Sequence, residues 1–274
     1  MIALVPILAA LAAFGLYYFY KRWRDQSLRN KPFPDDWLAI VESRLPLYSA
    51  LSLQEQSQLL QRIKFFIDRK EFYGCAGLAI TDEIRVTIAA EACLLLLNKK
   101  RPVYPKLTAI LVYPTAFQVE REQHQADGTI ASGAQGMLGE SWDNGRVILS
   151  WDDVEKGARD FTDGHNVVLH EFAHQLDAES GSTNGAPPLR RNSYSVWARV
   201  FSDNFEDLDV RSHAGLKTVM DDYGTTNPAE FFAVATETFF EKPHQLSKQR
   251  PELYEELRTY YQIDPRQWQS KDSG

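Results

Sequence analysis

One stretch of the chain constrains both its fold and its chemistry: His170-Glu171-Phe172-Ala173-His174-Gln175-Leu176-Asp177. Positions four apart lie on the same face of an α-helix, so His170 and His174 can offer two imidazole nitrogens to one metal ion. Glu171 stands beside the first histidine, where its carboxylate can take a proton from an attacking water. Zinc is the expected metal, because it accepts nitrogen and oxygen ligands tetrahedrally and leaves one position open.

The residues around the two histidines favour a helix that packs against a core. Asp163 is the expected N-cap of this helix. The apolar face is supplied by Val168, Leu169, Phe172, Ala173 and Leu176. A pattern that fixes only three positions also arises by chance, and a pair of structural histidines is the alternative interpretation. The helical context favours the metal site.

A hydrolytic zinc site needs a third protein ligand, with the fourth position left open. Asp177 shares a face with His170 but lies about 10 Å farther along the helix axis, beyond the reach of its short side chain. A hydrogen bond to a group around the metal, or a role at the helix end, suits Asp177 better. His213 stands in a polar stretch and is not favoured as a ligand.

Glu230 is the better candidate for the third ligand. Asn227 can cap a helix whose first residue is Pro228, the favoured place for proline. Glu230 then falls in the first turn, and Glu237 lies two turns on along the same face. The alternative for Glu230 is an ordinary capping acid that hydrogen-bonds back to the Asn227 backbone.

Together these segments resemble a known family. The resemblance rests on the following residues: His170-Glu171-Phe172-Ala173-His174-x-Leu176-Asp177, Asn184-Gly185-x-Pro187, Tyr223, and Asn227-Pro228-Ala229-Glu230-x-Phe232-Ala233-Val234. They are similar to those of the Mlc titration factor A family of zinc metallopeptidases, whose catalytic half is similar to the metalloprotease domain of anthrax lethal factor. The resemblance covers roughly residues 35–265. One departure is Asn227, which stands where an acidic residue is typical, and it concerns helix capping more than metal binding.

The resemblance implies a fold, a cofactor and a set of roles. The fold is a zincin-like α+β domain, mostly helical, with a small sheet beside the metal helix. The cofactor is one Zn²⁺ per chain, held by His170, His174 and Glu230. Glu171 is implied as the general base, and Tyr223 as the residue that supports the transition state. Without the resemblance, the sequence context of Tyr223 favours a buried core tyrosine.

Two functions follow from this resemblance. The first is a peptidase acting on a peptide or protein substrate, with endopeptidase and aminopeptidase action both open. The second is a regulatory protein that sequesters a transcriptional repressor, as the family name implies, with zinc structural and peptidase activity incidental. Complete catalytic residues favour the enzyme, because pure binding does not need Glu171 beside an open metal position.

The start of the chain predicts a membrane anchor over residues 1–21. Residues 2–20 contain no charged side chain and span nearly 30 Å as a helix, about the thickness of a bilayer core. Four aromatic residues, 17–20, are followed at once by basic ones, which predicts a single-pass helix in the inner membrane with the catalytic domain in the cytoplasm. A buried helix of a soluble protein is the alternative. Residues 22–34 form a basic linker.

Charge and cysteine content limit the possible partners and the redox state. The whole chain carries a net charge of −7, and residues 1–34 hold five basic side chains and one acidic one, so +4 there leaves −11 for the remainder. Such an acidic body argues against nucleic-acid binding. Cys75 and Cys93 lie in apolar surroundings and are expected to be reduced.

The remaining pattern predicts a helical domain over residues 35–265 and a flexible tail over 266–274. Helices are expected at about 52–69, 81–97, 195–205 and 251–262, and strands at 107–113, 146–151 and 117–122. We expect strand 146–151 to be an edge that pairs with an extended peptide substrate, with an internal strand as the alternative. The Gly- and Pro-rich loop 179–188 is either a lid over the site or a connector.

Overall fold

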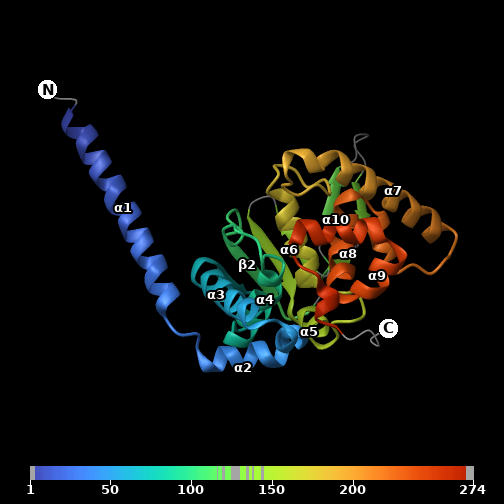
Figure 1. Cartoon of the computed structure of the whole chain (residues 1–274), viewed down its shortest axis with the longest axis horizontal. Helices are drawn as coiled ribbons and strands as arrows, with labels where there is room; N and C mark the ends of the chain where they lie inside the picture. The colour runs from blue at the N-terminus through green and yellow to red at the C-terminus, as the bar shows by residue number, and fades with distance from the viewer. Residues whose placement is uncertain are drawn as a thin grey trace.

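The computed structural model describes the backbone of residues 4–115, 117–118, 121–124, 130–133, 136–137, 139–142 and 145–269, and the side chains of residues 11–115 and 145–269. Figure 1 shows a helix-rich body with a sheet in it and a long N-terminal helix that extends away from it. The helices are α1 (Leu4–Asn30), α2 (Asp35–Arg44), α3 (Leu53–Arg69), α4 (Asp82–Leu94), α5 (Trp151–Arg159), α6 (Val167–Ala178), α7 (Tyr194–His213), α8 (Pro228–Glu241), α9 (Pro243–Gln249) and α10 (Pro251–Tyr261). Short 3₁₀ turns are η1 (Pro46–Ala50), η2 (Arg191–Ser193), η3 (Asp222–Thr225) and η4 (Pro265–Gln267).

A four-stranded sheet supports the domain, in the order β1-β2-β8-β7. Its strands are β1 (Glu71–Gly74), β2 (Ala109–Tyr113), β8 (Arg146–Ser150) and β7 (Gly139–Trp142). The first three are parallel, and β7 runs antiparallel to β8. Two further pairs of short strands form separate two-stranded sheets. They are β3 (Phe117–Gln118) with β6 (Gly136–Met137), and β4 (Arg121–His124) with β5 (Ile130–Gly133). The predicted α+β fold, mostly helical with a small sheet, is confirmed at this level.

The prediction that strand 146–151 forms a sheet edge is wrong. β8 pairs with β2 on one side and with β7 on the other, so its backbone groups are already used by both neighbours. Its central side chains, from Val147 to Ser150, are buried. Runs of β-branched residues are typical of strands covered on both faces, and this strand follows that rule.

The metal helix α6 begins at Val167, with Asn166 as its N-cap. The Asn166 side-chain oxygen accepts a hydrogen bond from the Leu169 amide at 2.9 Å. The prediction of Asp163 as the cap is therefore wrong: its carboxylate accepts from the His165 amide and closes a turn before the helix. The helix packs against α4, α5, β7 and β8, and most extensively against α8.

Helix α8 begins as the sequence predicts, at Pro228 with Asn227 as its N-cap. The Asn227 side chain accepts from the amides of Ala229 and Glu230 at 2.9 and 3.0 Å. This leaves the Glu230 carboxylate free to point at α6, which removes the capping-acid alternative.

The loop 179–188 is fastened to the helices around it through Gly185. The Gly185 amide donates to Asp177 at 2.6 Å, and its carbonyl accepts from the Trp197 indole at 2.9 Å. Gly185 has φ +79°, and a side chain there would bring Cβ to within 2.3 Å of the Pro228 carbonyl oxygen. Only glycine fits this position, so the segment is a fixed connector rather than a lid.

The N-terminal helix α1 has 27 residues and carries exposed apolar and aromatic side chains from Leu11 to Trp23. Its C-terminal part is joined to α3 by two ion pairs of opposite polarity, Arg24–Asp68 at 2.8 Å and Asp25–Arg69 at 2.6 Å. Where side chains are described, no helix has both the length and the apolar character needed to cross a membrane. Residues 1–10 of the predicted anchor lie outside that described part.

Most of the other predicted elements agree with the structure. Helices α3, α4 and α10 occupy the expected segments, and α7 is longer than predicted because it continues to His213. Residues 22–30 of the basic linker continue α1 as helix. The tail predicted from residue 266 is ordered at its start, since Trp268 is buried and Gln269 donates to Glu241 O at 3.1 Å. Cys75 and Cys93 are free thiols, as expected.

The core behind the metal helix contains a buried carboxyl group, Glu91 on α4. Glu91 is 0% exposed, and neither of its carboxylate oxygens has a hydrogen-bond partner among the described residues. Burial raises the pKa of Glu91 to about 8, because a charge there would lose its hydration. The folded protein therefore holds this carboxyl in its neutral form at neutral pH.

We expect Glu91→Gln to flatten the dependence of stability on pH. The Glu91 pKa is about 8 in the folded chain and 4.5 as the ordinary value, so between these two pH values the native state binds the extra proton. The stabilisation that comes from this extra proton is fully present below about pH 4.5 and is lost as pH rises. Over this range the free energy of unfolding falls by up to about 1.4 kcal/mol per pH unit.

Urea unfolding at pH 5.5, 6.5 and 7.5 measures this effect. The difference in the free energy of unfolding between Glu91→Gln and wild type should grow in favour of the variant with each step in pH. The exposed Glu42→Gln on α2 is the matched control and should follow wild type. If the free energy of unfolding changes with pH equally in wild type and Glu91→Gln, the Glu91 carboxyl is not held neutral.

Candidate metal centre

Three side chains from two helices converge on one point. His170 and His174 lie one turn apart on α6, and Glu230 enters from the first turn of α8. Glu230 Oε2 is 3.0 Å from His170 Nε2 and 3.2 Å from His174 Nε2, and the two Nε2 atoms are 3.2 Å apart. Among the residues that the structure describes, this is the one group of histidine, cysteine and carboxylate side chains that could hold a metal ion.

The spacing of these three atoms fits zinc. Ligands at about 2.05 Å from a tetrahedral zinc ion are about 3.3 Å from one another, close to the separations observed. Two imidazole nitrogens and one carboxylate oxygen are also the donor set that zinc accepts while keeping a fourth position open. The predicted grouping of His170, His174 and Glu230 as a possible metal site is thus confirmed.

Charges around His170 favour a positive charge at this point. Burial alone would lower the pKa of His170, but the neighbouring carboxylates Glu237 and Glu230 raise it well above its ordinary value. Burial alone would raise the pKa of Glu230, but hydrogen bonds with His170 and His174 outweigh burial and hold it well below its usual range. The group is electrostatically prepared for a cation.

Glu237 orients the first histidine. Its Oε1 lies 2.7 Å from His170 Nδ1, and its Oε2 accepts the Asn166 backbone amide at 2.6 Å. The carboxylate fixes the ring so that Nε2 faces the other two ligand atoms. His174 Nδ1 has no corresponding partner among the described residues. The sequence placed Glu237 on the face of Glu230 but gave no sign of this contact, which depends on how α8 packs on α6.

Glu171 is buried beside the metal-ligating group. Its side chain is 3% exposed, and its Oε2 has no hydrogen-bond partner within the described part of the chain. Burial raises the pKa of Glu171 to about 7, with His174 and His170 opposing the rise. A carboxylate with an unused oxygen and a near-neutral pKa is suited to accept a proton.

Tyr223 lies beside the metal-ligating group and is half exposed, so it is not a core residue. It is 48% exposed and sits on η3, and its ring centroid is 5.9 Å from that of His170. Partial burial of this side chain, with the nearby charges of Glu230 and Glu171, raises the pKa of Tyr223 to about 12. The hydroxyl therefore keeps its proton and is available as a hydrogen-bond donor to a substrate.

Two other sequence candidates lie away from the metal-ligating group, as expected. Asp177 is fully buried and accepts the Gly185 amide, so its role is to hold the following loop. His213 is exposed at the end of α7, with Nδ1 2.9 Å from the Asp209 carbonyl oxygen.

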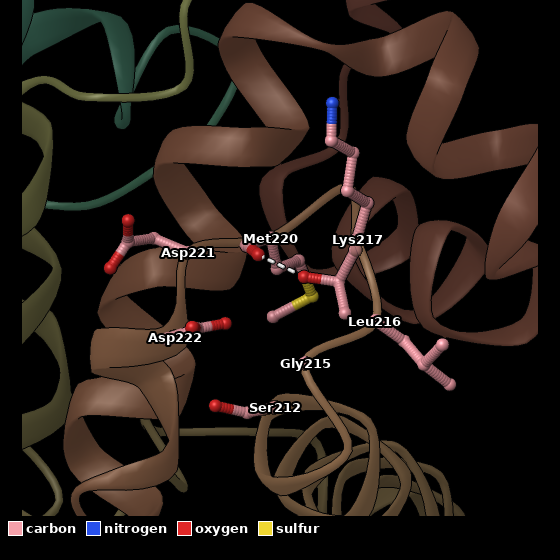
Figure 2. Close-up of a pocket in the computed structure, with 8 residues that line it drawn as sticks. Ser212, Gly215, Leu216, Lys217, Met220, Asp221 and Asp222 are labelled. Carbon is pink, nitrogen blue, oxygen red and sulfur yellow. Dashed lines mark hydrogen bonds between the residues drawn. The ribbon is translucent and has the colours of Figure 1, made fainter.

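A pocket of ≈ 360 Å³ adjoins the turn that carries Tyr223. It is formed between the end of α7 and the start of η3, and its lining includes Ser212, Met220 and Asp222. Figure 2 shows the Asp222 side chain directed toward the other lining residues, whereas the Asp221 carboxylate points away from them. The residues that line this pocket include neither Tyr223 nor a member of the metal-ligating group.

The family model for the glucose-regulated metallo-peptidases M90 matches residues 20–262. The chain belongs to this family. It is 43% identical to slr2042, an uncharacterized protein of Synechocystis, over 96% of this chain and 97% of the relative. It is also 32% identical to Mlc titration factor A of Serratia proteamaculans, over 81% of this chain and 85% of the relative. The same factor of Yersinia pestis is 30% identical, over 81% and 82%.

The family match confirms the resemblance inferred from the motifs. His170, His174, Glu230 and Tyr223 all lie within the matched M90 region. Residues 1–19, which hold most of the predicted anchor, lie outside it. The resemblance to Mlc titration factor A that the sequence motifs indicated therefore extends over most of the body of this M90 chain.

We expect Glu237→Ala to weaken zinc binding. The variant removes the carboxylate that orients His170, and losses of this kind lower metal affinity about 10- to 100-fold. Competition with a chromophoric chelator measures the dissociation constant. The exposed Glu206→Ala on α7 is the control and should bind zinc as wild type does. Unchanged affinity in a folded Glu237→Ala protein would show that the contact is not needed for metal binding.

Proposed function

We propose that this M90 chain is a zinc-dependent peptidase that hydrolyses peptide bonds. The observation that carries the proposal is the convergence of His170 Nε2, His174 Nε2 and Glu230 Oε2 within 3.2 Å of one another. It is supported by the adjacent buried Glu171 and by membership in a metallo-peptidase family. Endopeptidase and aminopeptidase action both remain compatible with this site.

In the proposed mechanism the residues divide the work of proton transfer and charge stabilisation. Zinc, when bound by the three ligands, supplies Lewis acidity that activates water and polarises the scissile carbonyl. Glu171 accepts a proton from the attacking water and delivers it to the leaving amine. The Tyr223 hydroxyl donates a hydrogen bond to the oxyanion that develops on the substrate. Glu237 holds the His170 ring throughout.

The substrate is proposed to lie along β7. This strand is antiparallel to β8, contacts α6, and has β8 as its one paired neighbour among the described strands. An extended peptide can add to such an edge through backbone hydrogen bonds. We therefore assign to β7, the edge strand of the described sheet, the substrate-pairing role that the sequence predicts for segment 146–151.

We expect Glu171→Gln to abolish turnover while zinc stays bound. The amide keeps the size of the side chain but cannot accept the proton, which costs about 10²- to 10⁴-fold in rate. Metal analysis and cleavage of a peptide library, with and without chelator, measure the two properties. His170→Ala is the comparison and should lose both. Cleavage at the wild-type rate by zinc-loaded Glu171→Gln would refute the mechanism.

A binding role is the second candidate, and the names of the relatives support it. The relatives from Serratia proteamaculans and Yersinia pestis are both called Mlc titration factor A. A chain of this family could bind a transcriptional repressor through its surface, with zinc structural. The Glu171→Gln variant separates the two candidates, because a binding role would survive that change in full.

We further propose that residues 1–21 anchor the protein in the inner membrane, with the catalytic domain in the cytoplasm. The proposal is supported by the exposed apolar and aromatic side chains of α1 from Leu11 onward. Basic residues follow directly, beginning with Lys21 and Arg22. Positive charge after an apolar helix favours placing that end on the cytoplasmic side.

We expect the pair Leu11→Asp and Phe14→Asp to reduce membrane association. Each charge in the apolar part of a membrane helix costs about 2.5–3.5 kcal/mol. Flotation of cell membranes measures the bound fraction. Val210→Asp, at an exposed apolar position on α7, is the matched control and should leave the fraction unchanged. Wild-type protein that remains at the bottom of the gradient would contradict the anchor.

A further inference from the structure

The proposed role of Tyr223 requires its hydroxyl to be held in place, although the side chain is half exposed. Tyr223 is 48% exposed and belongs to a single turn of 3₁₀ helix, η3. Such a turn has too few internal hydrogen bonds to fix a side chain by itself. Contacts from outside the turn are therefore needed to keep Tyr223 beside the metal-ligating group.

The backbone on both sides of Tyr223 is held by side chains. The Tyr223 amide donates to Asp221 Oδ1 at 2.7 Å, so Asp221 is the N-cap of the turn. The Tyr223 carbonyl oxygen accepts from the Thr226 hydroxyl at 2.8 Å and from the Thr226 amide at 3.1 Å. Between them, Gly224 packs so closely that an added Cβ would lie 3.1 Å from Leu208 on α7.

The other oxygen of Asp221 faces the segment that leads into the metal helix. Asp221 Oδ2 is 3.8 Å from His165 Nε2. His165 is held in its own turn, because its amide donates to Asp163 at 2.9 Å. The next residue, Asn166, is the N-cap of α6. Figure 2 agrees with this arrangement, since the Asp221 carboxylate points away from the pocket residues around it.

We propose that Asp221 is a positioning residue that sets the place of Tyr223 relative to the metal-ligating group. One carboxylate oxygen caps the turn that carries the tyrosine, and the other contacts the segment just before α6. Asp221 thus lies between the turn of the proposed oxyanion donor and the segment that precedes the helix with His170 and His174. The inference rests on the proposed peptidase function and gives Asp221 no contact with the substrate.

A positioning role predicts that Asp221 affects the transition state more than substrate binding. Removing the cap with Asp221→Ala should lower kcat about tenfold and leave KM within about twofold. Asp221→Asn can still accept the Tyr223 amide and should recover most of the rate. His165→Ala, which keeps the cap, should resemble Asp221→Asn. Zinc content should equal that of wild type in all three variants.

Asp264 offers a matched control for the loss of a cap as such. Asp264 is the N-cap of another 3₁₀ turn, η4, and accepts from the Arg266 amide at 3.2 Å. Asp264→Ala should lower the melting temperature without changing kcat. An equal fall in kcat for Asp264→Ala and Asp221→Ala would overturn the positioning role, because general destabilisation would then explain both.

A double-mutant cycle tests whether Asp221 acts through Tyr223. If it does, Tyr223→Phe already removes the benefit, and adding Asp221→Ala should cost less than twofold more. The affinity for a phosphinic peptide, which mimics the tetrahedral transition state, provides a second measurement by calorimetry. Tyr223→Phe and Asp221→Ala should weaken this binding alike. Losses that multiply in the double variant would overturn the inference.

The two proposals fail in different ways. If Glu171→Gln cleaves peptides at the wild-type rate, the proposed peptidase mechanism fails and Asp221 has no reaction to support. If Glu171→Gln is inactive but the effects of Asp221→Ala and Tyr223→Phe are independent, the peptidase function stands and only the positioning role is refuted.

Discussion

The packing of α8 against the start of α6 is the contact on which the site depends. Three glutamates on one side of α8 meet α6 or its entry: Glu230 reaches both histidines, Glu237 contacts His170 and the Asn166 amide, and Glu241 accepts the Gly164 amide at 2.9 Å. Backbone amides at a helix N-terminus carry partial positive charge, which helps to offset the cost of burying these carboxylates. Sliding one helix along the other would therefore break the metal-ligating group and the supporting hydrogen bonds together.

This arrangement keeps several acidic groups in a low-dielectric interior. Glu91, Glu237 and Glu241 are all at most 6% exposed. Burial, together with the charges of Glu237 and Asp163, raises the pKa of Glu241 well above its ordinary value. Carboxyls that hold their protons can lie close to a negatively charged neighbour without full repulsion. Burying these acidic groups next to α6 carries a cost in electrostatic free energy, which protonation of some of them reduces.

His170, His174 and Glu230 could be predicted as a metal site because their signals in the sequence are local. His170 and His174 follow helical spacing, and Asn227 followed by Pro228 indicates the start of the helix that carries Glu230. The prediction fails where two capping residues compete within one short segment, and where the deciding interaction joins distant segments. Asp163 and Asn166 are both good capping residues, and only the turn made by Asp163 and His165 decides between them. Likewise, β8 could not be recognised as internal, because its neighbour β7 has the weak strand signal of Gly139-Glu140-Ser141-Trp142. The seven-residue spacing places Glu237 on the same helix face as Glu230. The sequence does not show that Glu237 would contact Nδ1 of His170.

Gly185 determines how the rim of the site can move. Its amide, its carbonyl and its α-carbon each face a different helix, through Asp177 on α6, Trp197 on α7 and the Pro228 carbonyl on α8. A flexible loop exchanges its amide hydrogens with solvent through local fluctuations, whereas an amide bonded between packed helices exchanges only when those helices separate. The exchange of the Gly185 amide hydrogen is therefore coupled to the packing of α6, α7 and α8 around it.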